Sequence, residues 1–298
     1  MIKRKLLLCG LFWAWVNVCQ AQDDLMALMT DSVAETQHVL PAFKGTRVIN
    51  GHSVQTLGKQ NLDFLISHRF DRVNRGAYDF FGLDGALIRL GLEYGLTDDV
   101  TVGIGRSSYF KTYDAYAKYR FLKQTANNSM PVTAAAFFSV NARTQRLIAP
   151  QELSGTDRLT YTSQLLVARR FNEHLSVQLS PTYIYRVRPE MTTDEQGVFA
   201  FGIGGRYLLN KRISFNGEYF YVPSGQINAV YTNNISFGFD IDTGGHVFQL
   251  HFTNSYGMTE RYFITETVDS WAEGDIHFGF NISRRFALGS KSGSSKKW

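Results

Sequence analysis

The sequence predicts an all-β fold: a transmembrane, antiparallel, up-and-down β-barrel of about twelve strands, with a range of ten to fourteen. Apolar and polar residues alternate in segments of roughly nine to fourteen residues, the length that a tilted strand needs to cross a bilayer. Aromatic residues make up 14% of the chain, enough to form girdles at both membrane interfaces. Beyond residue 21, no run approaches the ~18 consecutive apolar residues that a spanning helix needs.

The chain begins with the features of an export signal. Lys3, Arg4 and Lys5 precede an apolar run over 6–18, and Ala21 ends a plausible cleavage site. The apolar run is too short for a membrane-spanning helix. We therefore predict a secretory signal peptide over residues 1–21, and with it a location in the outer membrane.

This leader contains both cysteines and much of the net charge. Cys9 and Cys19 lie in it, so the mature chain has no thiol for a disulfide, a metal cluster or a nucleophile. A lipoprotein signal acylated at Cys19 is the alternative. Removal of the three basic residues lowers the formal net charge from +5 to +2. The basic composition is therefore no argument for nucleic-acid binding.

Residues 22–58 form a predicted periplasmic segment ahead of the barrel. Within it, residues 23–35 could form a short helix with apolar side chains roughly on one side, and a flexible leader is the alternative. Asn50-Gly51 is a strong two-residue hairpin signal, and its arms are too short to span a bilayer. We expect this hairpin at the periplasmic mouth or in the lumen as a small plug, with a loose linker as the alternative.

The barrel is predicted over residues 59–288, followed by a basic tail over 289–298. In the second predicted strand, Leu90 and Leu92 share one face, and Arg89, Gly91 and Glu93 share the other. This is a period of two and not a helical period. The predicted strands are 59–70, 84–96, 98–107, 112–123, 131–142, 158–171, 174–187, 197–209, 211–222, 232–242, 246–256 and 274–287.

The connections alternate in length. Tight turns follow even-numbered strands at 97–99, 172–173, 210–211 and 243–245, and longer segments follow most odd-numbered strands at 71–83, 143–157, 188–196, 223–231 and 257–273. Barrels of this kind have short periplasmic turns and long outer loops. The exceptions are a short connection near Ser108 and a longer turn over 124–130. A soluble β-sandwich would also alternate, but the long strands, the unbroken apolar faces and export without cysteines count against it.

Four segments carry a resemblance to a known family. They are 46–54 (TRVINGHSV), 62–70 (LDFLISHRF), 92–106 (LEYGLTDDVTVGIGR) and 274–283 (GDIHFGFNIS). Together they resemble an uncharacterised family of Bacteroidota outer-membrane β-barrel proteins, a domain of unknown function. The resemblance spans most of the mature chain and implies a barrel and its location, but no activity. The tail after Leu288 is longer and more basic than the family suggests, which bears on whether the assembly machinery reads Phe286 as the barrel end.

The polar face is the predicted functional surface, lining the lumen with Asp63, Arg69, Arg89, Glu93, Asp114, Lys118, Arg120, Arg170, Arg186, Arg206, Glu218 and Asp240. These charges could brace a closed lumen, or line an aqueous path with a weak bias toward anions. We favour a narrow passive channel for a small polar solute. The alternative is a closed barrel with a structural or partner-scaffolding role.

Catalysis is the third possibility, because some outer-membrane barrels are lipid hydrolases. His52 and Ser53 are adjacent in the candidate hairpin, but adjacency in a loop does not give a nucleophile and base the required geometry. The sequence has no G-x-S-x-G, no H-E-x-x-H and no phosphate-binding loop. We therefore predict no enzyme activity and no cofactor.

One pair of histidines could bind a metal ion. His251 and His277 lie on the polar faces of the last two predicted strands, and counting back from the connecting loop places His251 opposite Gly279. Two imidazoles so placed could share Zn²⁺ or Cu²⁺. The alternative is two polar lumen residues bonded to water. Asp240, on the neighbouring strand, is about three residues out of register, so no carboxylate completes the shell.

The expected partners follow from the predicted location. They are outer-membrane lipid, the barrel assembly machinery and a small polar solute. No nucleic acid is expected, and we predict a monomer.

Overall fold

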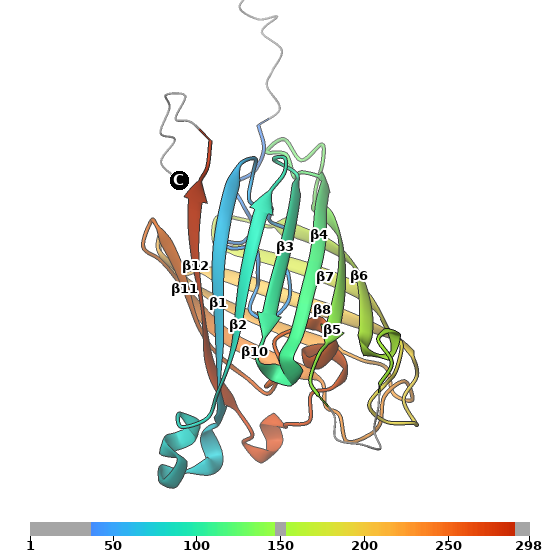
Figure 1. Ribbon diagram of the computed structural model, residues 1–298. Helices are drawn as coiled ribbons and strands as arrows, with labels where there is room; N and C mark the ends of the chain where they lie inside the picture. The colour runs from blue at the N-terminus through green and yellow to red at the C-terminus, as the bar shows by residue number, and fades with distance from the viewer. Residues whose placement is uncertain (1–36, 147–152, 290–298) are drawn as a thin grey trace, which may run out of the picture.

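The computed structural model describes residues 37–146 and 153–289, and in this part of the chain twelve antiparallel strands form a closed barrel (Figure 1). The predicted fold is therefore confirmed. Each strand pairs with its sequence neighbours, and β1 pairs with β12 to close the sheet. The signal peptide, the possible helix over 23–35 and most of the basic tail lie outside the described residues.

The strands follow the predicted segments to within a few residues. They are β1 (Asn61–Arg72), β2 (Ala86–Gly95), β3 (Val100–Ser107), β4 (Thr112–Leu122), β5 (Thr133–Arg143), β6 (Leu159–Arg170), β7 (Leu175–Arg186), β8 (Gly197–Leu208), β9 (Ile213–Tyr221), β10 (Asn234–Asp242), β11 (His246–Thr253) and β12 (His277–Ala287).

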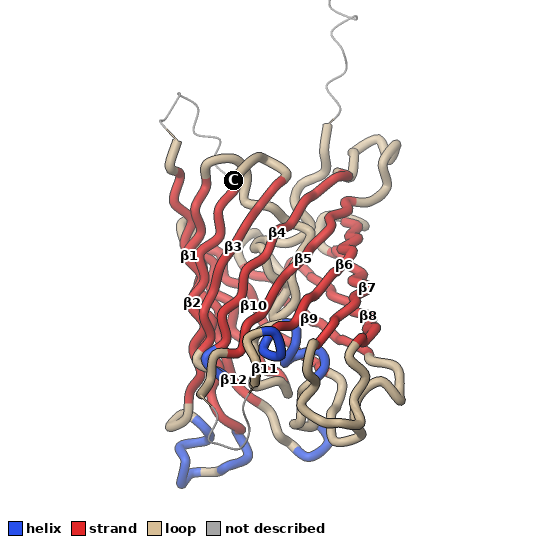
Figure 2. The backbone as a smooth tube through the Cα atoms, turned by 45° about the vertical axis from the view of Figure 1, so that its right-hand side comes forward, coloured by secondary structure: helices blue, strands red, loops and turns tan. Residues whose placement is uncertain are grey.

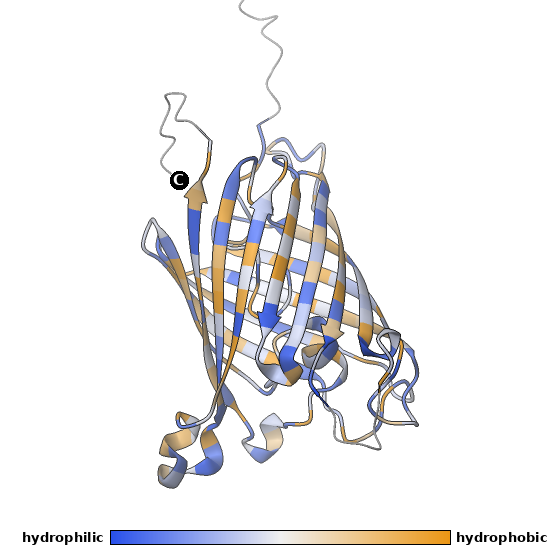
Figure 3. Cartoon of the chain, viewed as in Figure 1, coloured by the Kyte–Doolittle hydropathy of each residue, from blue (hydrophilic) through white to orange (hydrophobic). Residues whose placement is uncertain are grey.

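Apolar side chains point outward and polar ones inward along the strands. In β2, Leu92 is 43% exposed while the adjacent Glu93 is only 2% exposed. Hydropathy alternates in the same way along the strands of the wall in Figure 3. An apolar outer belt around a polar interior is the arrangement expected of a barrel that meets lipid.

The connections differ in length at the two ends of the barrel (Figure 1). Most of the connections at the upper end are short turns and most of those at the lower end are long; the exceptions are the longer connection 123–132 at the upper end and the short one, 108–111, at the lower end. The long connections contain short helical segments: η1 (Val73–Arg75), η2 (Ala77–Gly82), η4 (Thr156–Arg158), η5 (Arg261–Thr265) and η6 (Trp271–Glu273). Another, η3 (Tyr109–Lys111), joins β3 to β4. None of the helices in the described ranges is long and apolar enough to cross a membrane.

Residues 38–41 lie at the short-turn end beside the connection between β4 and β5, and residues 42–54 run inside the barrel. Phe43, Val48 and Val54 of this segment are buried, and they cluster with Tyr116 and Phe137 of the wall. A second segment, 254–268, folds inward from the opposite end and carries η5, the helix between the strands in Figure 2. Two insertions therefore occupy the lumen from its two ends.

Candidate functional site

The inner segment forms a hairpin, but its turn lies one residue earlier than an Asn50-Gly51 turn would: Arg47 pairs with His52, and Ile49 and Asn50 are the two central residues. The amide of Val48 donates to the carbonyl of Gly51 at 2.8 Å, and that of Ser53 donates to the carbonyl of Thr46 at 2.9 Å. A Cβ added at Gly51 would lie 2.9 Å from the ring of Phe220, so a side chain here would push the turn off the wall. We call residues 46–53 the lumen hairpin.

One carboxylate of the wall binds the turn of the lumen hairpin. Glu218 on β9 accepts hydrogen bonds from the backbone amides of Ile49 (3.2 Å), Asn50 (2.8 Å) and Gly51 (3.0 Å). The side-chain amide of Asn50 donates to Ser236 on β10 at 3.0 Å. A buried backbone amide without a hydrogen-bond acceptor destabilises the fold. Glu218 supplies the acceptors that a neighbouring strand or water would otherwise provide.

Other wall side chains bind the arms of the hairpin. Lys118 on β4 donates to the carbonyls of Ser53 (2.9 Å) and Thr46 (3.3 Å). The Thr46 hydroxyl donates to Glu93 on β2 at 2.6 Å. Gln178 on β7 donates to the carbonyl of His52 and accepts from the amide of Val54, both at 2.8 Å. Polar contacts with three separate strands therefore hold these arms.

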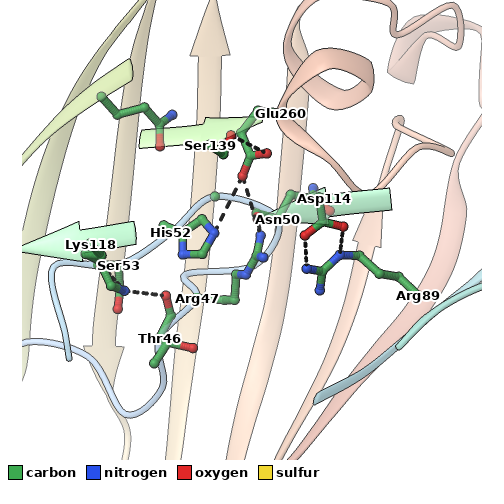
Figure 4. Close-up of polar contacts among 12 residues, drawn as sticks. Thr46, Arg47, Asn50, His52, Ser53, Arg89, Asp114, Lys118, Ser139 and Glu260 are labelled. Carbon is green, nitrogen blue, oxygen red and sulfur yellow. Dashed lines mark hydrogen bonds and ion pairs between the residues drawn. The ribbon is translucent and has the colours of Figure 1, made fainter. Parts of the chain in front are cut away.

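The lumen hairpin meets the second insertion at Glu260, as Figure 4 shows. The Glu260 carboxylate lies 3.8 Å from Nη1 of Arg47 and 3.6 Å from Nε2 of His52, and the hydroxyl of Ser139 donates to it at 3.5 Å. The Nε of Arg89 on β2 donates to Asp114 on β4 at 2.9 Å, and a second guanidinium nitrogen contacts the same carboxylate. The middle of the barrel therefore contains a buried network of charged groups.

The predicted lumen residues fall into two groups. Ten of them are buried on the inner side of the wall: Asp63, Arg69, Arg89, Glu93, Asp114, Lys118, Arg186, Arg206, Glu218 and Asp240. Arg120 and Arg170 are partly exposed at the short-turn end. There Arg120 pairs with Asp99 at 2.8 Å, and Arg170 donates to turn carbonyls. That these residues line a solute path stays a prediction.

The sequence reading missed the charged residues of the insertions. Arg47 and Glu260 are buried, and Arg261 pairs with Glu266 at 2.8 Å. Glu266 also lies 3.6 Å from the buried Arg186 of β7. One signal in the sequence could have indicated the second insertion. Residues 262–264 form an apolar run inside a connection that was predicted to face water, and an apolar run of this kind is expected to be buried against other residues.

The two histidines of the metal hypothesis have different surroundings. His251 lies opposite Gly279, as the count from the loop predicted, and neither of its ring nitrogens has a hydrogen-bond partner among the described residues. In His277, Nδ1 contacts the carbonyl of Phe70 and Nε2 contacts Asp269, both at 2.8 Å. Among the described residues, no three His, Cys, Asp or Glu side chains are grouped to hold a metal ion. Metal binding stays a prediction, and it would require His277 to leave its present partners.

A hollow of about 660 Å³ lies on the wall near Lys118, Phe137 and Ala200. Most of its lining consists of outward-facing apolar side chains such as Phe138, Leu165 and Phe201. It therefore faces the lipid side of the wall and is separate from the charged network of the lumen.

Several solved structures are similar to this chain. The NanC porin is 10% identical, with 76% of this chain and 100% of that chain covered and a TM-score of 0.48. An outer-membrane channel from Pseudomonas putida F1 is 14% identical, with 78% and 98% covered and a TM-score of 0.47. Outer membrane phospholipase A from Escherichia coli is 11% identical, with 77% and 91% covered and a TM-score of 0.44.

No curated protein matches the chain. A family model does, over residues 43–286, and this range includes the lumen hairpin as well as nearly all of the wall. The sequence-based resemblance to an uncharacterised barrel family is confirmed at this level. The chain belongs to the family described as a membrane-bound β-barrel domain, DUF5777.

Proposed function

We propose that this protein is an outer-membrane channel closed by its own lumen hairpin, and that a small polar solute passes when the hairpin leaves the lumen. The observation that carries this proposal is how the hairpin is held. Its backbone groups are bound by Glu218, Lys118 and Gln178, which are side chains of the wall. Water can replace each of these polar contacts, and the cost of releasing the hairpin then lies mainly in the apolar contacts of Val48 and Val54 with Tyr116 and Phe137.

The polarity of the wall supports the same function. A barrel of eight strands is filled by its own side chains, whereas sixteen or more leave a channel. With twelve strands, the lumen here holds a hairpin in addition to the wall side chains. Without that hairpin, the part of the charged inner face that it covers would be lined by water, and it would form a path for hydrated solutes past the segment 254–268, which also occupies the lumen.

A closed barrel with a structural or partner-scaffolding role is the second candidate, and the second insertion favours it. Phe263 and Ile264 are fully buried against Ile184 of β7 and Phe220 of β9. These contacts are apolar, so water does not replace them at low cost. A protein that keeps this insertion packed at all times would present its outer connections as a fixed surface.

We infer in addition that the protein is not an enzyme. The ring of His52 lies between Tyr116 and Phe137, with ring centroids 4.5 and 4.1 Å apart. The hydroxyl of Ser53 donates to the carbonyl of Gly45 at 2.6 Å. A nucleophile needs its base within hydrogen-bond reach, and the Ser53 hydroxyl is bound to Gly45 while, among the described residues, the ring nitrogens of His52 have no hydrogen-bond partner.

Single-channel recordings in planar bilayers test the channel. We expect the mature protein to remain closed for most of the recording, and a variant lacking residues 38–57 to conduct steadily. A variant lacking only residues 23–36 keeps the hairpin and serves as the control, with the behaviour of the mature protein. If the variant without 38–57 folds, as judged by heat-modifiable gel mobility, and yet never conducts, the scaffold replaces the channel as the function.

A further inference from the structure

A small, partly closed space lies where the lumen hairpin meets β1 and β2. Three guanidinium groups line it: Arg47 of the hairpin, Arg69 of β1 and Arg89 of β2. The remaining lining residues, among them Asn50 and Ser67, include no carboxylate. About 10 Å³ is open to the centre of a water-sized molecule, which corresponds to roughly one such molecule.

The three arginines differ in how their charges are compensated. Arg89 is held by Asp114 through two guanidinium nitrogens, and Arg47 lies 3.8 Å from Glu260. Arg69, by contrast, is 1% exposed and has no carboxylate within 4.0 Å among the described residues.

The only acceptor that the described residues offer Arg69 is the side-chain oxygen of Asn50, which is neutral. Nε and Nη1 of Arg69 have no partner in the described structure, and neither does Nε of Arg47. The Glu218 carboxylate accepts hydrogen bonds from the backbone amides of the hairpin turn and acts on Arg69 only at longer range, without a direct contact between the two side chains in the described structure. Nη1 of Arg69 lies beside Gly279 and Nε2 of His251. A buried cation with unused donors therefore borders the cavity.

A buried charge without a counter-ion carries a large desolvation cost. A water molecule in the cavity could accept from these donors, but it would leave the charge of Arg69 uncompensated. A small anion would accept the same hydrogen bonds and neutralise the charge as well. We propose that this cavity binds a single monovalent anion of about the size of chloride, held chiefly by Arg69 and Arg47.

This site would be complete only when the hairpin is in the lumen, because Arg47 belongs to the hairpin and Arg69 to the wall. A ligand that binds only the docked state stabilises that state by mass action. The anion would therefore hold the hairpin in place. This inference goes beyond the proposed function, because a barrel that never conducts could contain the same ion.

Bromide is the probe for the test, because its anomalous scattering distinguishes it from water. We expect crystals of the mature protein, refolded in sodium bromide, to show one anomalous peak between Arg47 and Arg69. Refolding in bromide removes any question of access to a closed lumen. Electron density at this position without an anomalous signal would mean that the cavity contains water only. That result overturns the proposal, whatever the thermal midpoints of the variants are.

The thermal midpoint gives a second readout. At constant ionic strength, exchange of gluconate for bromide should raise the midpoint of the wild type along a saturating curve, because gluconate is too large for the cavity. Arg69→Met should lose this dependence. Arg206→Met, at an inward arginine bound to Ser214 and the carbonyl of Ala42, should keep it. The same bromide dependence in wild type and Arg69→Met would also overturn the proposal.

Discussion

Glu218 connects the wall to the lumen hairpin through three backbone amides at the turn. A carboxylate is suited to this position because it only accepts hydrogen bonds and has room for several donors. The neutral isostere, glutamine, would place two N–H donors where one of the carboxylate oxygens now accepts. At position 218, the ability of the side chain to accept hydrogen bonds should therefore matter more for holding the hairpin than the size of the side chain.

We expect Glu218→Gln to loosen the hairpin. At least one buried amide would lose its acceptor, which costs about 1–3 kcal/mol. The loss should appear as faster proteolysis within 38–57 and as a lower free energy of unfolding in urea. Glu173→Gln, in an exposed turn, is the matched control and should leave both unchanged. Equal proteolysis of the two variants would contradict the role assigned to Glu218.

Leucines along β2 test which face meets lipid, and at what depth. Leu92 lies in the middle part of β2 and is 43% exposed, and Leu96 follows the end of the strand and is 49% exposed. Leu92→Arg should cost about 2–4 kcal/mol in the free energy of unfolding from lipid vesicles, and Leu96→Arg about 0–1 kcal/mol. Equal costs at the two sites would place the bilayer elsewhere on the wall.

Among the elements, the hairpin shows how far local sequence patterns reach. Asn50-Gly51 specifies a two-residue turn wherever the segment lies. Its place inside the barrel depends on Glu218, which is 168 residues from Asn50 in sequence, and on the Glu260 insertion. No periodicity within 46–53 carries that information. A turn near Asn50 could therefore be predicted from the sequence, whereas its register, with Ile49 and Asn50 as the central residues, and its depth in the lumen could not.

The strands were predictable for the opposite reason. Alternation along a strand is a local pattern that directly reports the two faces of the sheet. Counting from a connecting loop was even enough to place His251 opposite Gly279. The partners of His277 were not predictable, because one is the carbonyl of Phe70 across the barrel seam and the other is Asp269 in an irregular connection.

Two connections at the long-loop end are linked by Asp275. Nδ2 of Asn74 donates to it at 2.7 Å, and Nη1 of Arg72 donates at 3.0 Å. The hydrogen bond from Asn74, followed by that from Arg72 and the positive charge of Arg72, holds the pKa of Asp275 below its usual range. A carboxyl whose folded-state pKa is depressed stabilises the fold above its unfolded pKa, and this contribution is lost as the pH falls through the folded pKa.

We therefore expect the segment 73–85 to become more mobile as the pH is lowered below about 4, the usual pKa of an aspartate. Hydrogen exchange of this segment between neutral pH and about pH 3 measures the change. In Asp275→Asn, the part of the change in hydrogen exchange that comes from protonation of Asp275 should be absent. If the variant and the wild type keep the same pH profile, the link through Asp275 does not hold the two connections together.

For the whole molecule, the unequal ends of the barrel predict an orientation in the membrane. The long connections should face outside and the short turns should face the periplasm. Ser154 lies in a long connection and Asp98 in a short turn, and both are exposed. On intact cells, cysteine at position 154 should react with an impermeant thiol reagent and cysteine at position 98 should not. Both should react after permeabilisation. Labelling at 98 alone on intact cells would reverse the orientation.

The charge on the inner wall predicts how the opened barrel treats ions. Without the hairpin, the buried charged side chains of the strands would be cationic at Arg69, Arg89, Lys118, Arg143, Arg186 and Arg206, and anionic at Asp63, Glu93, Asp114, Glu218 and Asp240. The numbers of positive and negative side chains are almost equal, and side chains of both signs would line the same water-filled lumen. Such a lumen should discriminate only weakly between anions and cations, with a slight preference for anions.

The reversal potential of the variant lacking 38–57, in a tenfold gradient of potassium chloride, measures this preference. We expect a small shift toward the anion side, well below the ~59 mV that a perfectly selective pore would give. Arg206→Glu in the same variant changes the wall by two charges and should move the potential toward the cation side. Glu173→Gln, in an exposed turn, should not. A strongly selective parent, or no response to Arg206→Glu, would mean that ions do not pass along this wall.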